Sequence, residues 1–154
     1  MAKDDRPAVA PRMPGHLIRR LHQVSTRVFG QRLKAAGIDL TPIQFAALDA
    51  LRAHPGIDQA GLAEAVAKDR ATIGGVADRL EQKGLVTRIV SERDRRAREL
   101  TLSEAGRRIL AAAEPVVTAL QHEILPGLTE AEYAQFVALA AKAAAAAEEG
   151  DTTA

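Results

Sequence analysis

The chain has 154 residues, of which 47% are hydrophobic and 27% charged, and these values are typical of one globular domain. They exclude a disordered protein, and no segment approaches the roughly 20 consecutive apolar residues that a membrane-spanning helix needs. The sequence has no cysteine, which excludes disulfides, thiolate metal sites and cysteine nucleophiles. Its amino-terminal segment lacks the apolar stretch of a signal peptide, so we expect a cytoplasmic protein without membrane contact.

The formal net charge is only +1, but the charged residues are unevenly distributed along the chain. Between residues 68 and 98, nine lysines and arginines stand against five acids, whereas from residue 114 onward seven acids stand against one lysine. Such a distribution directs one part of a protein toward anions and another part away from them. We therefore expect residues 68–98, and not the carboxy-terminal part, to face phosphate groups.

A first helix is predicted at residues 16–37, after a flexible amino-terminal arm at residues 1–15. Its apolar residues recur at steps of three and four: Leu17, Leu21, Val24 and Val28. Thr41, which precedes a proline, is a suitable N-cap for a second helix that ends before His54. Asp58 is a suitable cap for a short third helix.

The next segment has the pattern of a helix followed by a β-hairpin. Asp69 caps a fourth helix, and Gly84 provides the left-handed residue that ends it. Residues 86–90 and 99–102 are β-branched or alternate in polarity, which predicts two strands joined by a polar loop. The order helix, turn, helix and hairpin predicts a winged helix-turn-helix domain at residues 38–102.

Two more helices are predicted in residues 103–148. Ser103 caps the first, which contains Pro115 as a possible kink and ends at a Pro-Gly pair. Thr129, with a glutamate three residues later, forms a capping box for an alanine-rich last helix. The acidic residues 149–154 predict a flexible tail.

The first and last helices carry more apolar surface than a winged helix can cover. Alanine-rich faces permit close approach of helices and suit a symmetric interface. We therefore expect residues 16–37 and 103–148 to form the dimerisation region of a homodimer. A monomer with a three-helix cap is the alternative. The fold class is thus mostly α-helical with a small hairpin.

The second helix of a helix-turn-helix fits the DNA major groove, about 12 Å wide, and presents its first turns to base edges. The corresponding candidates are Arg70, Ala71, Thr72, Gly74, Gly75 and Arg79. Arg70 can bind guanine or phosphate, Thr72 a thymine methyl or phosphate, and Arg79 phosphate. The small residues would allow the backbone to approach the duplex closely. The alternative is a solvated face, with Arg79 paired to Asp78 or Lys83.

The predicted hairpin loop is rich in arginine: Arg93, Arg95, Arg96 and Arg98. An arginine at a loop tip can enter a narrow minor groove, where A·T-rich sequence concentrates negative potential. We expect Asp94 to fold back onto a neighbouring arginine, such as Arg88 or Arg98, and to brace the loop. The loop is therefore a candidate wing for contacting double-stranded DNA.

Several of these segments, taken together, resemble the MarR family of transcriptional regulators. They are residues 61–66 (Gly-Leu-Ala-Glu-Ala-Val), 71–86, 94–96 (Asp-Arg-Arg) and 100–106. The resemblance implies that Arg96 enters the minor groove, that Asp94 braces it, and that the terminal helices build a two-fold dimer. In many members, bulkier or polar residues stand at the positions of Gly74 and Gly75.

The sequence is most similar to the branch associated with aromatic-acid degradation. This likeness implies a repressor that leaves a palindromic operator when it binds a small aromatic acid or its coenzyme A thioester. Arg19, Arg20 or His22 could bind a carboxylate or a coenzyme A phosphate. Phe29 or Phe45 could pack on a ring. Each of these residues also fits a plain role as a surface charge or a core aromatic.

The sequence does not favour an enzyme. Its four histidines lack the helical spacing of a metal-binding pair, and it has neither a glycine-rich phosphate loop nor a nucleophile elbow. We therefore expect no cofactor and no metal. The stronger rival is a winged helix that binds proteins or coats DNA without regard to sequence. A footprint on one palindrome would distinguish a regulator from a coating protein.

Overall fold

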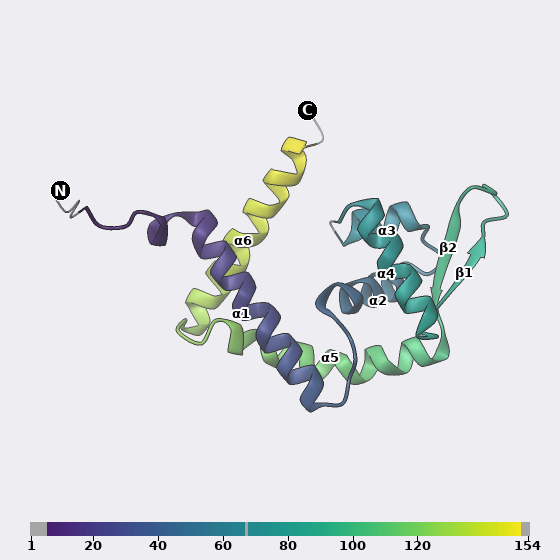
Figure 1. The fold of residues 1–154 in the computed structure, drawn as a ribbon, viewed down its shortest axis with the longest axis horizontal. Helices are drawn as coiled ribbons and strands as arrows, with labels where there is room; N and C mark the ends of the chain where they lie inside the picture. The colour runs from purple at the N-terminus through teal and green to yellow at the C-terminus, as the bar shows by residue number, and fades with distance from the viewer. Residues whose placement is uncertain (1–5, 67, 152–154) are drawn as a thin grey trace, which may run out of the picture. The chain divides into compact units, whose positions relative to one another are not determined.

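The computed structural model describes residues 6–66 and 68–151. In chain order the elements are η1 (Ala10–Arg12), α1 (Pro14–Ala35), α2 (Pro42–Ala53), α3 (Gln59–Ala65), α4 (Arg70–Gln82), β1 (Val86–Val90), β2 (Arg98–Leu102), α5 (Glu104–Ile124) and α6 (Glu130–Asp151) (Figure 1). The predominance of helices and the short hairpin after α4 confirm the predicted fold class. The chain forms two compact units, residues 1–120 and 121–154.

Side-chain caps confirm four of the predicted helix starts in the first unit, those of α2, α3, α4 and α5. Four residues act as caps: Thr41, Asp58, Asp69 and Ser103. Each accepts a hydrogen bond from the backbone N–H three residues later, at 2.7 to 3.2 Å. These bonds satisfy amide groups that lack a partner inside the helix. In the second unit, Thr129 and Glu132 form the predicted reciprocal box, with hydrogen bonds of 2.8 and 3.3 Å.

Some helices extend further than the sequence predicted. α1 begins at Pro14, and η1 occupies part of the segment predicted as an arm. α5, by contrast, has the predicted extent and runs through Pro115, with Ala113 and Val117 on either side of the proline packed into the core. α6 continues to Asp151 through acidic residues that were expected to fray, because the preceding alanines favour the helix. Residues 1–5 of the predicted arm and 152–154 of the predicted tail lie outside the described residues.

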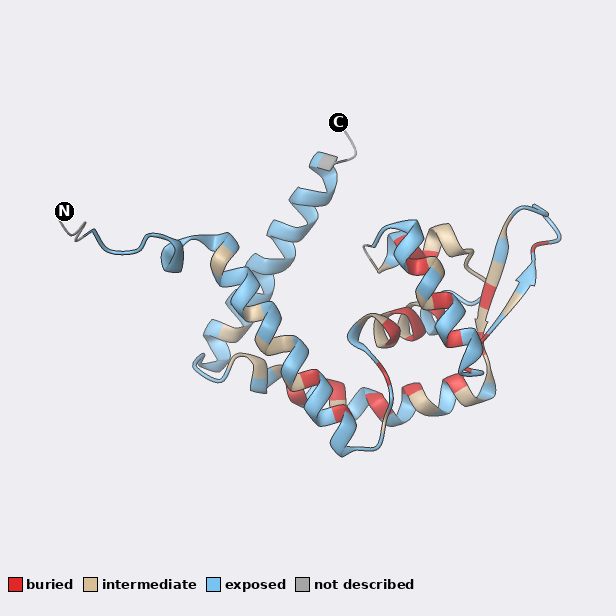
Figure 2. Ribbon diagram, viewed as in Figure 1, coloured by how far each residue is buried: buried red, intermediate tan, exposed pale blue. Residues whose placement is uncertain are grey.

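The core of the first unit joins the helix-turn-helix to β2, α1 and α5 (Figure 2). Its largest fully buried side chains are Leu33, Leu48, Leu51, Leu62, Ile73, Leu80, Leu100, Leu110 and Leu120. Burial of one such side chain stabilises a fold by about 1.5–3 kcal/mol. The buried face of α4 is therefore held firmly, and its opposite face is left to solvent.

The hairpin is anchored to the helices on both sides. β1 and β2 pair antiparallel, and β2 starts at Arg98, one residue earlier than predicted. On its other edge, β2 pairs with the segment before α3, where Leu100 exchanges backbone hydrogen bonds with Gly56 and Ile57 at 3.1 and 2.9 Å. Gly84, between α4 and β1, has the predicted left-handed conformation, with φ of 72°. This backbone pairing keeps the base of the hairpin beside α3.

The second unit leaves almost all of α6 exposed. Tyr133 is partly buried and stacks on His122, with ring centroids 4.4 Å apart. Three large apolar side chains of α6 face solvent: Phe136, Val137 and Leu139, which are 36%, 48% and 58% exposed. A helix with this much uncovered apolar surface is unusual for a monomer. Within the described residues, no helix is long and apolar enough to cross a membrane.

Candidate nucleic-acid interface

α4 separates its residues into a buried face and an exposed face. Ile73, Ala77 and Leu80 pack into the core. The exposed face carries five of the six predicted contact residues in this helix: Arg70, Ala71, Thr72, Gly75 and Arg79. Ala71, Gly75 and Arg79 are spaced four residues apart and therefore share one side of the helix. The exposed face thus combines two arginines with two small residues that leave the helix backbone accessible.

Thr72 has a second role that the sequence analysis missed. Its hydroxyl donates to Asp69 Oδ2 at 2.7 Å, while its backbone N–H donates to Asp69 Oδ1 at 2.8 Å. The hydroxyl bond, and then the amide bond, hold the pKa of the Asp69 carboxyl below its ordinary value. Because the Thr72 proton is engaged in this cap, the side chain offers its methyl group, rather than a hydrogen-bond donor, to a ligand.

The two adjacent glycines of α4 have different surroundings. A Cβ atom placed at Gly74 would lie 3.0 Å from Nε2 of Gln59 in α3, so this glycine serves the close packing of the two helices. A Cβ atom at Gly75 would meet nothing within 4 Å. The prediction that both glycines form the contact surface stays a prediction, and Gly75, which faces open space, is the better placed of the two.

The loop between β1 and β2 is ordered by its own polar residues. Ser91, which is 6% exposed, accepts hydrogen bonds at its Oγ from the backbone of Arg93 and Asp94 at 3.2 and 3.4 Å. Ala97 N–H donates to the Asp94 carbonyl at 2.9 Å. Serine at the start of a turn commonly makes such bonds, so a serine directly after the first predicted strand could have predicted this ordered turn from the sequence. These contacts hold the arginines of the loop on an ordered turn.

The structure corrects one predicted partner of Asp94, while its bracing role stays a prediction. Its Oδ1 accepts a hydrogen bond from the backbone N–H of Arg96 at 3.0 Å, which is the local turn that aspartate commonly forms. Arg88, expected to pair with Asp94, instead forms an ion pair with Asp78 of α4 at 2.8 Å. The reason is strand alternation: Arg88 lies opposite the buried Leu100 and so points toward the helices, away from the loop tip.

The Arg88–Asp78 pair therefore connects the wing to the helix beside it. The Arg88 side chain is only 16% exposed, whereas that of Asp78 is 60% exposed. A charge this far removed from water requires a partner, and Asp78 supplies it from the exposed side of α4. The four arginines of the predicted loop remain exposed, the last of them as the first residue of β2: Arg93, Arg95, Arg96 and Arg98. Two of them, Arg96 and Arg98, line a cleft of about 320 Å³ together with the first residues of α3.

The five candidate effector-binding residues are not gathered into one site within the described chain. Phe29 is 5% exposed and belongs to the core, and it meets the partly buried Phe45 edge-on, with ring centroids 6.4 Å apart. Arg19, Arg20 and His22 are exposed on the amino-terminal half of α1. At about 1.5 Å of rise per residue, they lie roughly 10 Å or more from Phe29 along the helix. Among the described residues, no group of three or more potential ligands could hold a metal ion.

Comparisons with known proteins agree with this geometry. A family model described as MarR family matches residues 38–97. The transcriptional regulator HosA of Escherichia coli O157:H7 is 36% identical over 127 residues, which cover 82% of this chain and 91% of HosA. BpsR of Bordetella bronchiseptica, whose DNA binding is regulated by 6-hydroxynicotinic acid, is 30% identical, with a TM-score of 0.83 and coverage of 90% and 98% of the two chains.

A third similar structure contains nucleic acid. It is a variant of MarR from E. coli in complex with operator DNA, 26% identical to this chain, with a TM-score of 0.78 and coverage of 90% and 99% of the two chains. These relatives are described as regulators and not as enzymes. Identity over most of both chains, together with the matching winged helix, shows that this protein belongs to the MarR family and is a DNA-binding transcriptional regulator.

Proposed function

We propose that this protein is a cytoplasmic repressor that binds a palindromic operator as a homodimer and leaves it on binding a small aromatic acid or its coenzyme A thioester. The observation that carries the proposal is the exposed face of α4 beside an ordered, arginine-rich wing, both anchored to one core. In this arrangement α4 enters the major groove through Arg70, Ala71 and Gly75. The wing arginines reach the backbone and the minor groove.

The dimer proposal is supported by the terminal helices. α6 has 22 residues and leaves Phe136, Val137 and Leu139 exposed. On α1, Leu17 and Ile18 are also exposed, at 43% and 66%. We propose that residues 16–37 and 103–148 bury these side chains against a second copy. A two-fold axis would then place two copies of α4 in successive major grooves, with half-sites about 10 bp apart.

The effector class is inferred from chemistry and from one relative. BpsR responds to 6-hydroxynicotinic acid, which is an aromatic carboxylic acid. An acid of this class needs a cation and an apolar surface, and the exposed Arg19, Arg20 and His22 of α1 can supply the cation. Phe29 is buried near the end of α1, and the Phe45 ring that meets it edge-on is only partly buried, so Phe45 can supply the apolar surface. In a site between two copies, the cationic side chains of one copy could lie beside the aromatic side chains of the other.

One experiment tests operator recognition and effector response together. A palindromic duplex would be selected from a random library by the full-length protein, and its affinity compared with that of a scrambled duplex of equal length. We expect tight binding to the palindrome alone, and release by 6-hydroxynicotinic acid, by hydroxybenzoates or by their coenzyme A thioesters. Equal affinity for both duplexes would indicate a coating protein, and no release by any of these compounds would refute the effector proposal.

Sedimentation equilibrium tests the homodimer. We expect a dimer at micromolar concentration, because the exposed side chains of α1 and α6 favour association. Removal of the chain beyond Pro126 should reduce DNA affinity by at least tenfold, since a monomer engages one half-site only. A monomeric full-length protein, or full affinity after the truncation, would refute the dimer.

Gly75→Ala should separate fold stability from DNA binding. Alanine is a better helix former than glycine, and its methyl group meets nothing within 4 Å, so unfolding in urea should become harder by about 0.5–1 kcal/mol. On DNA the same methyl group occupies the space where a base edge or sugar approaches, and affinity should fall by on the order of 1 kcal/mol. Unchanged or improved affinity for the selected palindrome would show that DNA does not approach this residue.

A further inference from the structure

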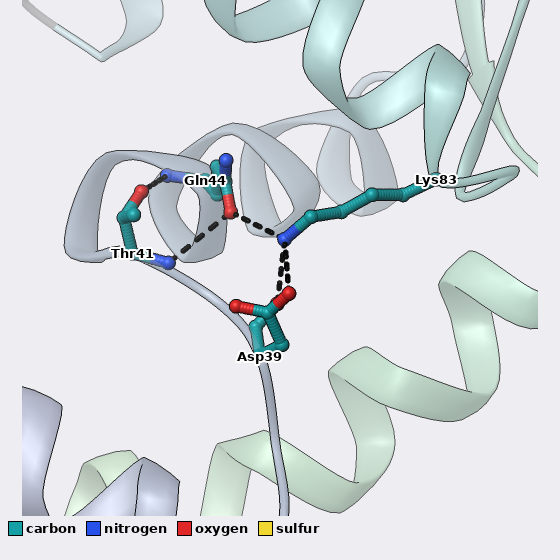
Figure 3. A network of polar contacts seen from close by, with 4 residues as sticks. All are labelled: Asp39, Thr41, Gln44 and Lys83. Atoms are coloured by element: carbon teal, nitrogen blue, oxygen red, sulfur yellow. Dashed lines mark hydrogen bonds and ion pairs between the residues drawn. The ribbon is translucent and has the colours of Figure 1, made fainter.

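The residue that follows α4, which we call the reading helix, is hydrogen-bonded to the connection between α1 and α2 (Figure 3). Lys83 is the C-cap residue of α4. Its Nζ donates to the carbonyl oxygen of Asp39 at 2.8 Å and to Oε1 of Gln44 at 3.2 Å, and it lies 3.2 Å from Oδ2 of Asp39. An ammonium group has three donors, and here all three have an acceptor.

Gln44 makes this contact part of a larger network. Its side chain belongs to the capping box of α2, in which Oε1 accepts from Thr41 N–H and Oγ1 of Thr41 accepts from Gln44 N–H, both at 3.2 Å. Gln44 is 8% exposed, and its amide oxygen has two lone pairs, one for Thr41 and one for Lys83. The end of α4 is thus bonded to the same oxygen that shapes the start of α2.

The connection that Lys83 binds, residues 36–41, is short and is ordered by backbone hydrogen bonds. α1 ends at Ala35, Gly37 has a left-handed φ of 71°, and Ile38 N–H donates to the carbonyl of Leu33 at 2.9 Å. Together, the left-handed glycine and this hydrogen bond form a Schellman motif, which ends the helix. Because Leu33 is also 1% exposed, the position of Asp39 is set by the buried end of α1. Through Lys83, the end of α1 therefore positions the end of α4.

The contribution of each contact differs with its exposure. The Asp39 carboxylate is 95% exposed, so water and salt screen its attraction to Lys83. The Asp39 carbonyl and the Gln44 amide are held by the backbone and by burial, and they give the contact its direction. The core packing of α4 supplies most of its stability, but hydrophobic packing is not directional.

We propose that Lys83 is a positioning residue that sets the angle between the reading helix and α1, and thereby the half-site spacing that the dimer accepts. The proposal rests on the proposed function. In a two-fold dimer, each α4 must meet its groove at a separation set by the protein, and one added base pair changes that separation by about 3.4 Å. A lysine that fixes the end of α4 makes the dimer reject such a change.

The test compares two duplexes, the selected palindrome and the same palindrome with one central base pair added. The measured quantity is the ratio of the two affinities for full-length protein. Loss of general stability lowers the active fraction on both duplexes equally and cancels in this ratio. Lys83→Met keeps the length of the side chain but has no donors. We expect it to reduce the ratio of the affinity for the palindrome to that for the lengthened duplex by about tenfold, which corresponds to the loss of one charged hydrogen bond.

Two matched variants locate the effect. Asp39→Asn keeps the backbone carbonyl and removes only the screened charge, so its ratio should stay within about twofold of wild type. Lys83→Arg keeps a charged donor and should restore most of the ratio. Should Lys83→Met fail to fold by circular dichroism, Lys83→Gln, which is too short to reach Asp39, takes its place.

A wild-type ratio in Lys83→Met or Lys83→Gln would overturn the positioning role. An equal loss in Asp39→Asn would also overturn it, because the exposed charge and not the directional bonds would then carry the effect. Equal affinity of the wild-type protein for the palindrome and a scrambled duplex would refute operator recognition, and with it the basis of this proposal.

Discussion

Replacing Arg96 with alanine is expected to weaken operator binding by about 1–3 kcal/mol, the size of a lost specific base contact. Arg96 is exposed on the wing, and its backbone N–H is held by Asp94 Oδ1 at 3.0 Å, so its side chain starts from an ordered turn. If that side chain enters the minor groove, the substitution removes a desolvated contact as well as one charge. Fluorescence anisotropy on the selected palindrome at two salt concentrations would measure the loss.

Arg93→Ala is the matched control for Arg96→Ala. Both residues are exposed arginines in the same loop, three positions apart. If Arg93 contacts phosphate, its replacement should weaken binding less than Arg96→Ala does and by the same factor on every sequence. It should also reduce the magnitude of the slope of log affinity against log salt by about 0.9. If Arg96→Ala binds as tightly as wild type, or if both variants behave alike, Arg96 does not read the minor groove.

Asp94→Ala should resemble Arg96→Ala, although it removes a negative charge. The structure supplies the reason, because the Asp94 carboxylate accepts a hydrogen bond from the backbone N–H of Arg96. Loss of this hydrogen bond should make the turn more flexible, so that the Arg96 side chain adopts a wider range of positions. Simple electrostatics predicts the opposite sign, since removal of an acid near phosphate strengthens binding. Improved affinity of Asp94→Ala would therefore refute the bracing role.

Gly106→Ala is expected to lower the free energy of unfolding by about 3 kcal/mol, at the upper end of what overpacking usually causes. Gly106 is buried in the first turn of α5, and a Cβ atom there would overlap the backbone carbonyl oxygen of Leu85. That oxygen also accepts a hydrogen bond from Ser103 N–H at 3.0 Å. The substitution must therefore displace backbone, not a flexible side chain, and break this bond. Urea denaturation would measure the loss.

Gly75→Ala is the control for Gly106→Ala, because the same substitution in another helix meets open space. The two variants should shift the urea midpoint in opposite directions. A Gly106→Ala protein as stable as wild type would mean that α5 and the residue before β1 can separate at little energetic expense. The anchoring of the wing to α5 would then be much weaker than the contacts indicate.

The helix starts and the elements themselves were predictable from sequence, because they depend on neighbours within a few residues. Thr41, Asp58, Asp69 and Ser103 cap their helices through bonds to the residue three positions later. The apolar period of α4 likewise indicated which face is buried. Such local bonds need no knowledge of the rest of the chain.

The candidate interface was predictable in composition but not in geometry. The sequence indicated an arginine-rich wing and a reading helix with small residues, and it named Arg96, Gly75 and Asp94. It did not indicate that Gly74 faces Gln59 or that Arg88 pairs with Asp78. Both depend on how α3 and β1 lie against α4, which is decided by contacts between residues ten or more positions apart.

The contacts of Lys83 show the same division most clearly. By sequence alone, Lys83 is a polar residue near the end of a helix, 44 positions away from the Asp39 carbonyl that it binds. Local propensity and periodicity determined that this chain forms a winged helix with long terminal helices. Only the tertiary structure decided which polar groups meet, because packing of the buried leucines places α1, α2 and α4 within reach of one another.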